Sequence, residues 1–241
     1  MFKRTKCRAI WTRIISIFKP EQDYRYVWNQ SAKTNVIDAI CYKHDKNDFE
    51  NTGKSTVDAL ILPIMPIKPI ALDVGCGIGR IETYLAAHCE KLYAVDVSDE
   101  MIKLAKERLK GIDNVVLDVV DGTSLKQFSD NMFDFIFSLL VLQHMEKEDA
   151  YMYLEEMHRV LKPRGILYLQ FPNFLTDVYF NSFMADVRSY PPRKKNRVRP
   201  YTVPEVEFMM KKAGFKIKPL SADVVHGAHN EPVEIFVVAT K

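Results

Sequence analysis

The glycine-rich stretch at residues 71–80 constrains the fold of this chain more than any other feature. An apolar run at 70–74 leads directly into glycines at alternate positions, Gly75, Gly77 and Gly79. Glycine lets the backbone adopt a positive φ and approach a ligand closely. A helical pattern begins at Arg80. The stretch therefore predicts a strand, a tight turn and a helix in an α/β sheet, with a ligand at the turn.

A second strand ends at an acidic residue in a position that suits the same ligand. The apolar run at 92–96 closes on Asp96, which follows Gly79 by 17 residues. A carboxylate in this position can accept hydrogen bonds from a ribose diol. The glycines are spaced G-x-G-x-G, and Asp73 lies just ahead of them. This combination resembles motif I of the class I S-adenosylmethionine-dependent methyltransferases more than the NAD fingerprint.

The rest of the chain alternates strand and helix patterns, which predicts a parallel sheet with helices on its faces. Ser98 is the expected N-cap of the second helix and Gly111 its stop. A capping box begins a helix at Thr202, which is expected to end at Gly214. Strands are expected at 91–97, 115–120, 133–142, 166–171, 215–218 and 234–240, and helices at 80–89, 101–110, 148–161 and 202–214.

Two further motifs carry the resemblance. FDFIFSLLVLQHM at 133–145 and EEMHRVLKPRGILYL at 155–169 look like the fourth-strand and helix-turn-strand motifs of small-molecule methyltransferases of type 11. Arg164 stands where the family usually has glycine, and Gly165 is expected to supply the turn. The resemblance covers about residues 67–241. It implies a doubly wound, seven-stranded, mostly parallel Rossmann-like sheet whose last two strands form an antiparallel hairpin.

The resemblance also implies S-adenosylmethionine as the cofactor and S-adenosylhomocysteine as the product, bound across the carboxyl ends of strands one to three. Asp96 matches the ribose acid and Asp121 the adenine acid. Val97 and Met101 would line the adenine pocket, and Leu139 would lie at the methionyl part. For these three residues, core packing explains the residue type as well as a cofactor contact does. The full set of expected cofactor-binding residues is Asp73, Gly75, Cys76, Gly77, Gly79, Asp96, Val97, Met101, Asp121, Gly122 and Leu139.

His144 is the candidate catalytic base, because it follows the fourth strand, whose tip faces the cofactor. A hydroxyl or ammonium acceptor must lose a proton during methyl transfer, which calls for a base near the methyl group. The alternative is a surface histidine at a helix start, with Gln143 as the acceptor contact. Tyr24, Tyr26 and Trp28 are the expected walls of the acceptor site.

Residues 1–66 are expected to form an N-terminal helical cap or lid outside the methyltransferase domain at 67–241. Within the cap, Ile10, Trp11, Ile14, Ile15 and Phe18 share one helical face. Residues 1–20 also contain six basic residues and no acid. This segment is too short and too charged to span a bilayer. It either packs on the domain or makes a peripheral membrane contact through residues 1–19.

A second basic segment lies in the expected acceptor-side insertion at 171–200, which also contains several aromatic residues. Residues 188–199 carry six basic residues and no acid. They either cover an anionic acceptor, such as a phosphorylated sugar or lipid, or form a solvated charge run. No nucleic-acid partner is expected, because nothing resembles an RNA-binding module. His226 and His229 are more simply loop residues than metal ligands, and no metal is expected.

The sequence thus predicts an enzyme that methylates an oxygen or nitrogen of a small-molecule, lipid-like or sugar-like acceptor. A non-catalytic cofactor-binding partner protein is the alternative. An NAD(P)-dependent oxidoreductase is less favoured, since G-x-G-x-x-G is absent. The four cysteines form no C-x-x-C pair, which favours a reducing, cytoplasmic location. Within the cytoplasm, the protein is either free or attached to a membrane surface through residues 1–19.

Overall fold

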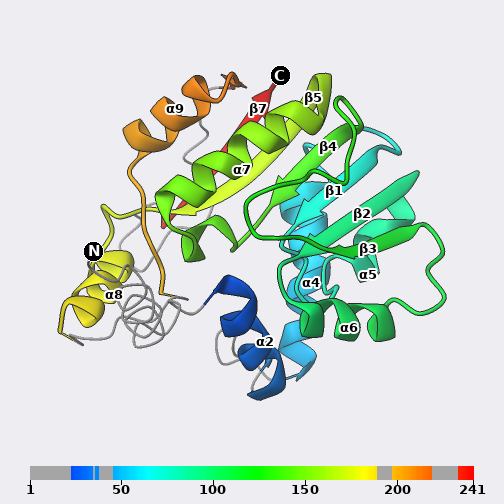
Figure 1. Ribbon diagram of the computed structural model, residues 1–241, viewed down its shortest axis with the longest axis horizontal. Coiled ribbons are helices and arrows are strands. Elements are labelled where there is room, and N and C mark those ends of the chain that lie inside the picture. Colours follow the sequence, from blue (N-terminus) through cyan, green and yellow to red (C-terminus); the bar gives the residue numbers. More distant parts are fainter. Residues whose placement is uncertain (1–22, 35, 38–45, 189–196, 219–232) are drawn as a thin grey trace, which may run out of the picture.

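The computed structural model describes residues 23–34, 36–37, 46–188, 197–218 and 233–241. Its centre is a seven-stranded sheet in the order β3-β2-β1-β4-β5-β7-β6 (Figure 1). Neighbouring strands from β3 to β5 are parallel, whereas β7 is antiparallel to both β5 and β6. The strands are β1 (Ile70–Val74), β2 (Lys91–Asp96), β3 (Val115–Val119), β4 (Phe133–Ser138), β5 (Leu161–Pro172), β6 (Lys216–Ile217) and β7 (Glu234–Thr240).

The strand order confirms the predicted doubly wound, mostly parallel sheet with an antiparallel hairpin at its edge. Two predicted strands differ in length from the observed ones. β4 ends at Ser138, so the apolar residues that follow it belong to a loop. β5 begins at Leu161, earlier than the apolar pattern indicated, because Leu161 pairs with Phe133 on β4 across a register shift.

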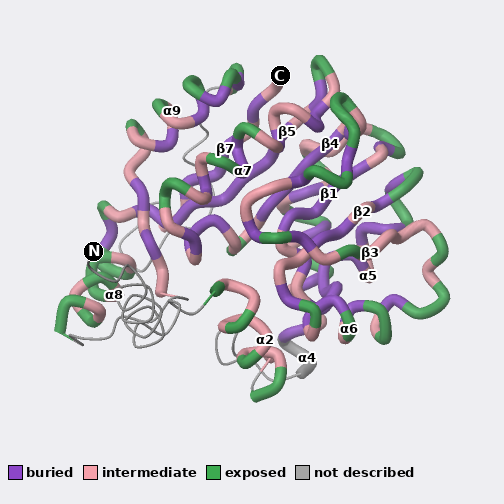
Figure 2. Tube along the Cα trace, viewed as in Figure 1, coloured by how far each residue is buried: buried purple, intermediate pink, exposed green. Residues whose placement is uncertain are grey.

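Helices cover both faces of the sheet, and side chains alternate between these faces along each strand. Leu72 and Ile136 belong to the apolar cluster that includes residues of α7 (Lys147–Val160) and α9 (Val203–Lys212). Ala71, Phe135 and Phe137 belong to the opposite cluster, with α5 (Glu82–Leu85) and the π-helical turn Val57–Ile61. The π-helical turn continues from α4 (Lys46–Thr56), and α6 (Asp99–Arg108) packs on the same side over Ala94. Figure 2 shows the buried layer along the central strands.

The predicted capping residues of α6 and α9 are confirmed. Ser98 Oγ accepts a hydrogen bond from the Met101 N–H at 3.1 Å and so caps α6. Gly111 follows that helix with φ of 90°. The capping box of Thr202 and Glu205 is present at the start of α9, and Gly214 follows its end with φ of 95°.

The turn before the apolar part of β5 corrects one prediction. Arg164 itself has a positive φ of 67°, whereas Gly165 does not. Arg164 therefore supplies the left-handed residue, and the prediction that Gly165 does so is wrong. Gly165 is needed for space instead, because an added Cβ would lie 2.7 Å from Leu161 Cδ1.

Four helices differ from the sequence prediction. Tyr24, Tyr26 and Trp28, which the sequence analysis assigned to no helix, lie in α2 (Tyr24–Thr34). The sequence pattern did not predict α4 as a helix. It also did not predict α8 (Asp177–Arg188) within the insertion. The predicted first helix of the sheet domain is shorter, consisting of α5 and the 3₁₀ turn Ala86–His88.

Several predictions lie outside the described residues, namely the amphipathic pattern at 10–18, the two histidines His226 and His229, and much of the second basic segment. Within the described ranges, no helix is long and apolar enough to cross a membrane. No group of three or more histidine, cysteine or acidic side chains there could hold a metal ion. The division of the chain at residue 67 stays a prediction.

Candidate functional site

The glycine loop lies at the carboxyl end of β1 and adopts the conformation that its sequence predicts. Gly75, Gly77 and Gly79 all have positive φ, at 97°, 55° and 78°. A side chain at Gly75 would collide with Val141 in the loop after β4, and an added Cβ at Gly79 would lie 2.9 Å from Leu109 Cδ1. The N–H groups of Gly75 and Cys76 both donate to the Val95 carbonyl, at 2.7 and 3.0 Å. The loop is therefore held closely against β2.

Asp96 joins the glycine loop to the end of β2. Its two carboxylate oxygens accept from the Gly77 N–H at 2.9 Å and from the Ser98 N–H at 2.8 Å. Burial raises the pKa of Asp96 to about 6, although these hydrogen bonds oppose the rise. A carboxylate has about four acceptor positions, so both oxygens can accept further hydrogen bonds. The predicted ribose contact is compatible with this geometry.

A pair of buried carboxyl groups lies behind the glycine loop. Asp73 is 3% exposed and Glu82, on α5, is fully buried. Burial raises the pKa of both groups, and the neighbouring Glu82 raises that of Asp73 further. Apart from Asp73, neither oxygen of Glu82 has a hydrogen-bond donor in the described part of the chain. A proton carried by Asp73 and donated to Glu82 satisfies both groups without placing two charges in the core.

Asp121, the predicted adenine acid, is turned toward its own loop. Its carboxylate accepts from the Thr123 N–H at 2.9 Å, from the Ser124 N–H at 2.7 Å and from the Ser124 hydroxyl at 2.7 Å. Partial burial acts to raise its pKa, but the hydrogen bonds from Ser124 and Thr123 outweigh it, so the pKa falls. Gly122 beside it has a positive φ of 97°. The adenine contact of Asp121 stays a prediction.

Helix α2 lies over the same edge of the sheet through side chains that the sequence did not single out. Arg25 donates to the Val97 carbonyl at 3.1 Å and to the Val120 carbonyl at 3.0 Å, just past the ends of β2 and β3. Asn29 accepts from the Ser98 hydroxyl at 2.6 Å. These carbonyls border the predicted adenosyl site, so a ligand bound there would have α2 on one side.

The loop after β4 brings the candidate base next to α2. The ring of His144 lies edge-on to Trp28, with centroids 5.1 Å apart, and its Nε2 is 3.0 Å from Gln143 Nε2. The Tyr24 hydroxyl donates to Asp149 at 2.7 Å and accepts from the Glu146 N–H at 2.8 Å. Three of the expected acceptor-side residues, Tyr24, Trp28 and His144, are thus assembled between α2 and this loop.

The other expected site residues lie in different surroundings. Met101 is 1% exposed and packs in a cluster with Phe49 and Ile78. Leu139 is half-buried and packs against the α5 side of the core. Tyr26 is 51% exposed. For Met101 and Leu139, core packing alone accounts for what the structure shows, and their cofactor contacts stay predictions.

Arg199 is a buried residue near the site that the sequence analysis counted only as part of a charge run. Its guanidinium pairs with Glu146 and donates to the His144 carbonyl at 2.9 Å, while its own N–H donates to the Gln143 carbonyl at 2.7 Å. It therefore holds the His144 loop. No local sequence pattern marks this role or that of Arg25, because both depend on partners far away in the chain.

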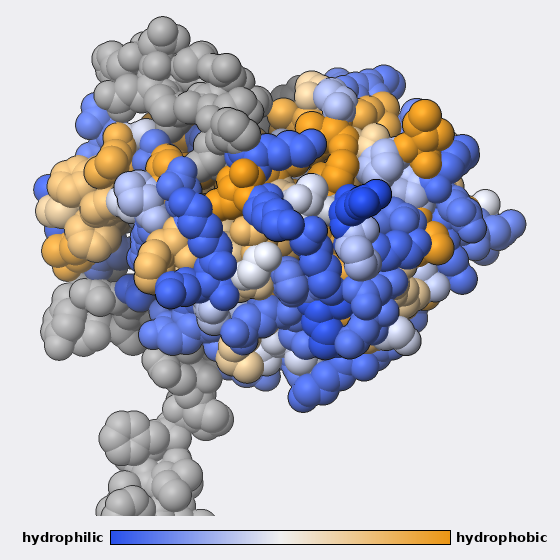
Figure 3. Space-filling view, turned by 90° about the horizontal axis from the view of Figure 1, so that it is seen from above, coloured by the Kyte–Doolittle hydropathy of each residue, from blue (hydrophilic) through white to orange (hydrophobic). Residues whose placement is uncertain are grey.

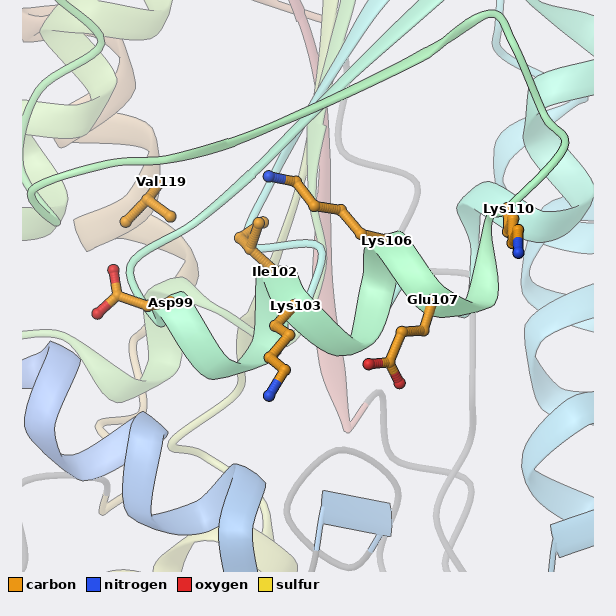
Figure 4. Close-up of a pocket in the computed structure, with 7 residues that line it drawn as sticks. All are labelled: Asp99, Ile102, Lys103, Lys106, Glu107, Lys110 and Val119. Atoms are coloured by element: carbon orange, nitrogen blue, oxygen red, sulfur yellow. The ribbon is translucent and has the colours of Figure 1, made fainter.

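A surface depression of the molecule lies away from these residues, along the outer side of α6. Figure 4 shows its lining, in which Lys103 and Glu107 extend to one side of the helix and Lys106 to the other. The lining residues are Asp99, Ile102, Lys103, Lys106, Glu107, Lys110 and Val119. None of them is an expected site residue, and long charged side chains dominate the depression. We assign no function to it.

Comparison with known proteins identifies the family. Residues 72–169, from β1 to β5, match a family model described as a methyltransferase domain. The match supports a class I S-adenosylmethionine-dependent methyltransferase domain within residues 72–169. The strand order and the glycine loop of the methyltransferase agree with this assignment. The prediction of S-adenosylmethionine as the cofactor is confirmed at the level of the family.

Several curated proteins and solved structures resemble the methyltransferase chain. Phosphoethanolamine N-methyltransferase 1 of Caenorhabditis elegans is 25% identical over 148 residues, 61% of this chain and 30% of the relative. Phosphoethanolamine N-methyltransferase 1 of Arabidopsis thaliana is 34% identical over 166 residues, 61% of this chain and 33% of the relative. A methyltransferase structure from Methanosarcina mazei has a TM-score of 0.60 at 22% identity, covering 76% of this chain and 97% of that one. The chain spans about a third of the length of these curated relatives.

The residues present fit this cofactor. The glycine loop presents its backbone without side chains at the carboxyl end of β1, and Asp96 beside it retains acceptor positions. The cofactor carries a positively charged amino group and a sulfonium. Asp96 lies at this loop, and the Asp73–Glu82 pair, which holds one proton and one negative charge, lies behind it.

Proposed function

We propose that this methyltransferase transfers a methyl group from S-adenosylmethionine to an oxygen or nitrogen atom of a small acceptor. The observation that carries the proposal is the convergence at one sheet edge of the glycine loop, Asp96 and the His144 loop. The contact of Val141 with Gly75 couples the loop after β4 directly to the glycine loop. Cofactor-binding and acceptor-side residues are thus neighbours.

When bound, S-adenosylmethionine supplies a methyl group that its sulfonium already activates. The chain must then orient an acceptor, exclude water and take up a proton. Trp28 and Tyr24 of α2 cover the side of the site from which water would enter. His144 is the proposed proton acceptor, and its ring is oriented by Trp28 and Gln143.

The contact between Gln143 and His144 determines which ring nitrogen can act. An amide NH₂ only donates, so His144 Nε2 accepts this hydrogen bond, and the neutral ring carries its proton on Nδ1. Proton uptake at Nε2 therefore requires the Gln143 amide to turn its oxygen toward the ring or to move away.

The names of the relatives guide the choice of acceptors to test. Several are phosphoethanolamine N-methyltransferases, one is a cyclopropane-fatty-acyl-phospholipid synthase of Escherichia coli, and one is a ubiquinone biosynthesis O-methyltransferase of Rickettsia canadensis. The two basic segments of the sequence support an acceptor that carries negative charge. We therefore propose a phosphorylated amine as the first acceptor class to test, ahead of phenols and lipids.

Calorimetric titration with S-adenosylmethionine, S-adenosylhomocysteine and NADH tests the first step. We expect micromolar binding of both adenosyl ligands and none of NADH. Transfer of labelled methyl groups to phosphoethanolamine, to phenols and to lipid vesicles then tests the acceptor. His144→Ala should abolish most transfer while leaving cofactor affinity unchanged. Cofactor binding without transfer to any class would favour the non-catalytic alternative, and binding of NADH alone would refute the site.

A further inference from the structure

Helix α8 is apolar, yet none of its residues is buried. Its sequence, DVYFNSFMADVR, contains two phenylalanines and three other large apolar or aromatic residues besides methionine. Phe180 is 46% exposed, and Phe183 and Val187 are each 41% exposed. Phenylalanine side chains are normally covered in a soluble domain, and an exposed apolar group of this kind marks an interaction surface.

The exposed residues share one side of the helix. Phe180, Phe183 and Val187 follow one another at spacings of three and four residues, which places them in one stripe. Phe174, just before the helix, packs against both phenylalanines with centroid distances of 6.0 and 5.4 Å. Figure 3 shows an apolar patch at the left-hand end of the molecule, the end at which α8 lies in Figure 1.

The helix is held in place from its other side, so the stripe is directed outward. The Tyr179 hydroxyl donates to Glu234 at the start of β7, and Thr176 bonds the Asn173 carbonyl at 2.9 Å in the approach to the helix. Leu175, in the same approach, is 70% exposed. These bonds fix the beginning of α8 to the sheet and leave Phe180, Phe183 and Val187 uncovered.

Charge indicates what covers this stripe. The sequence from Arg188 to Arg199 carries six basic residues and no acid, and residues 1–20 carry six more. Arg199 pairs with Glu146 inside the protein, whereas Arg188, at the end of α8, is exposed. Self-association through α8 would bring two such groups together, which like-charge repulsion opposes. An anionic membrane surface would attract the basic residues through its headgroups and cover the apolar stripe with its hydrocarbon region.

We propose that α8 is a peripheral membrane-binding helix, whose Phe180, Phe183 and Val187 enter the boundary region of a bilayer containing anionic lipids. Arg188, the exposed basic residue in the last turn of the helix, would contact the lipid headgroups. The proposal concerns a surface outside the candidate site and does not depend on the identity of the methyl acceptor.

Sedimentation of the full chain with phosphatidylcholine vesicles, with and without phosphatidylglycerol, tests the proposal. We expect binding to the anionic vesicles only, weakening as salt is added. Phe180→Ser with Phe183→Ser should reduce the partition coefficient roughly tenfold or more, since two half-exposed phenylalanines lose their transfer into the bilayer. The matched control is Phe208→Ser with Met152→Ser, which replaces exposed apolar residues on α9 and α7 and should leave vesicle binding unchanged.

A fluorescence measurement tests directly whether α8 enters the bilayer. Phe183→Trp should show a blue-shifted emission and quenching by brominated lipids when anionic vesicles are added, whereas Phe208→Trp should show neither. Equal vesicle binding by the α8 double variant and the wild type would overturn the proposal. An equal loss of vesicle binding in the α9 and α7 control variant would also overturn it. So would a wild-type protein that does not bind vesicles but forms a concentration-dependent dimer, if the α8 double variant abolishes that dimer.

Discussion

At the scale of single residues, Asp96 has a structural task besides the ribose contact that we propose for it. Its oxygens hold the Gly77 and Ser98 N–H groups, so it fixes the glycine loop to the end of β2 before any ligand arrives. Arg164 illustrates the opposite case, a residue whose type does not suit its backbone conformation. Substitutions of Asp96 and Arg164 therefore have separate expected effects on ligand binding and on stability.

Asp96→Ala should weaken the binding of S-adenosylmethionine by about 1.5 to 3 kcal/mol, the range for losing a charged hydrogen-bond partner. Calorimetric titration measures this change. Asp118→Ala is the control, because Asp118 is an exposed acid on the neighbouring strand, and its register partner is Val95. Unchanged affinity in the Asp96 variant would contradict the ribose assignment.

The raised pKa of Asp96 predicts a pH dependence of stability in the absence of ligand. Its pKa is about 6 in the folded protein, above its ordinary value of 3.8, so the folded state binds the proton more tightly than the unfolded state does. The free energy of unfolding should therefore fall as pH rises from about 4 to 6. Asp73 and Glu82 shift in the same direction and add to this fall.

Urea denaturation across this pH range, on the wild type and on Asp96→Asn, measures the contribution of Asp96. The variant should show a shallower fall, because asparagine does not titrate. Identical pH profiles for the two proteins would show that Asp96 is not the titrating group.

Arg164→Gly should raise the free energy of unfolding by roughly 0.5 to 1 kcal/mol. The left-handed conformation costs a residue with a Cβ about 1–2 kcal/mol, and the greater chain entropy of unfolded glycine offsets part of the gain. Gly165→Ala provides the comparison and should be destabilising, because the added Cβ meets Leu161. A loss of stability in Arg164→Gly would contradict the strain argument.

At the scale of elements, α2 and the loop after β4 form the acceptor side of the site together. Arg25 and Asn29 fasten α2 to the ends of β2 and β3, and Trp28 reaches His144. The helix has no buried residue, so polar contacts contribute much of its attachment.

Arg25→Ala should loosen α2 by about 1 to 2 kcal/mol, since two hydrogen bonds from a partly exposed guanidinium are lost. Hydrogen exchange should then speed up in α2 and remain unchanged in β1, β2 and β4. Lys33→Ala is the control on the same helix, because the ion pair of Lys33 with Glu100 is exposed and contributes little. Faster exchange throughout the sheet in Arg25→Ala would contradict the view that α2 opens by itself.

The sequence predicted the sheet elements well because their signals are local. β1 and β7 occupy the predicted 70–74 and 234–240, where apolar runs are bounded by turn residues, and Ser98 and Thr202 mark helix starts by their own chemistry. The sequence could not predict that Arg25 contacts Val120 or that Arg199 supports His144. These contacts join residues 95 and 55 positions apart, and no periodic pattern encodes them. α8 was missed because its apolar residues face outward.

At the scale of the whole molecule, one sheet is shared by two apolar layers. β4 contributes Ile136 to the α7 and α9 layer and Phe135 and Phe137 to the α5 layer. Phe137→Ala should lower the free energy of unfolding by about 3 to 5 kcal/mol.

Because both layers rest on the same strands, hydrogen exchange in Phe137→Ala should speed up on both faces together, in α7 as well as in α5. Val238→Ala, at a partly buried position in the same layer, should cost less and serves as the graded comparison. Loss of protection confined to the α5 face would mean that the two layers unfold independently.

The attachment of α2 has a consequence for the order of events in folding and binding. Val97 and Val120 lie one residue beyond the ends of β2 and β3, so their carbonyls bond Arg25 without taking part in the strand pairing. The sheet can therefore form completely before α2 docks, and α2 can leave without breaking a single strand-to-strand bond. A ligand that enters beneath α2 competes only with a few side-chain contacts and leaves the core intact.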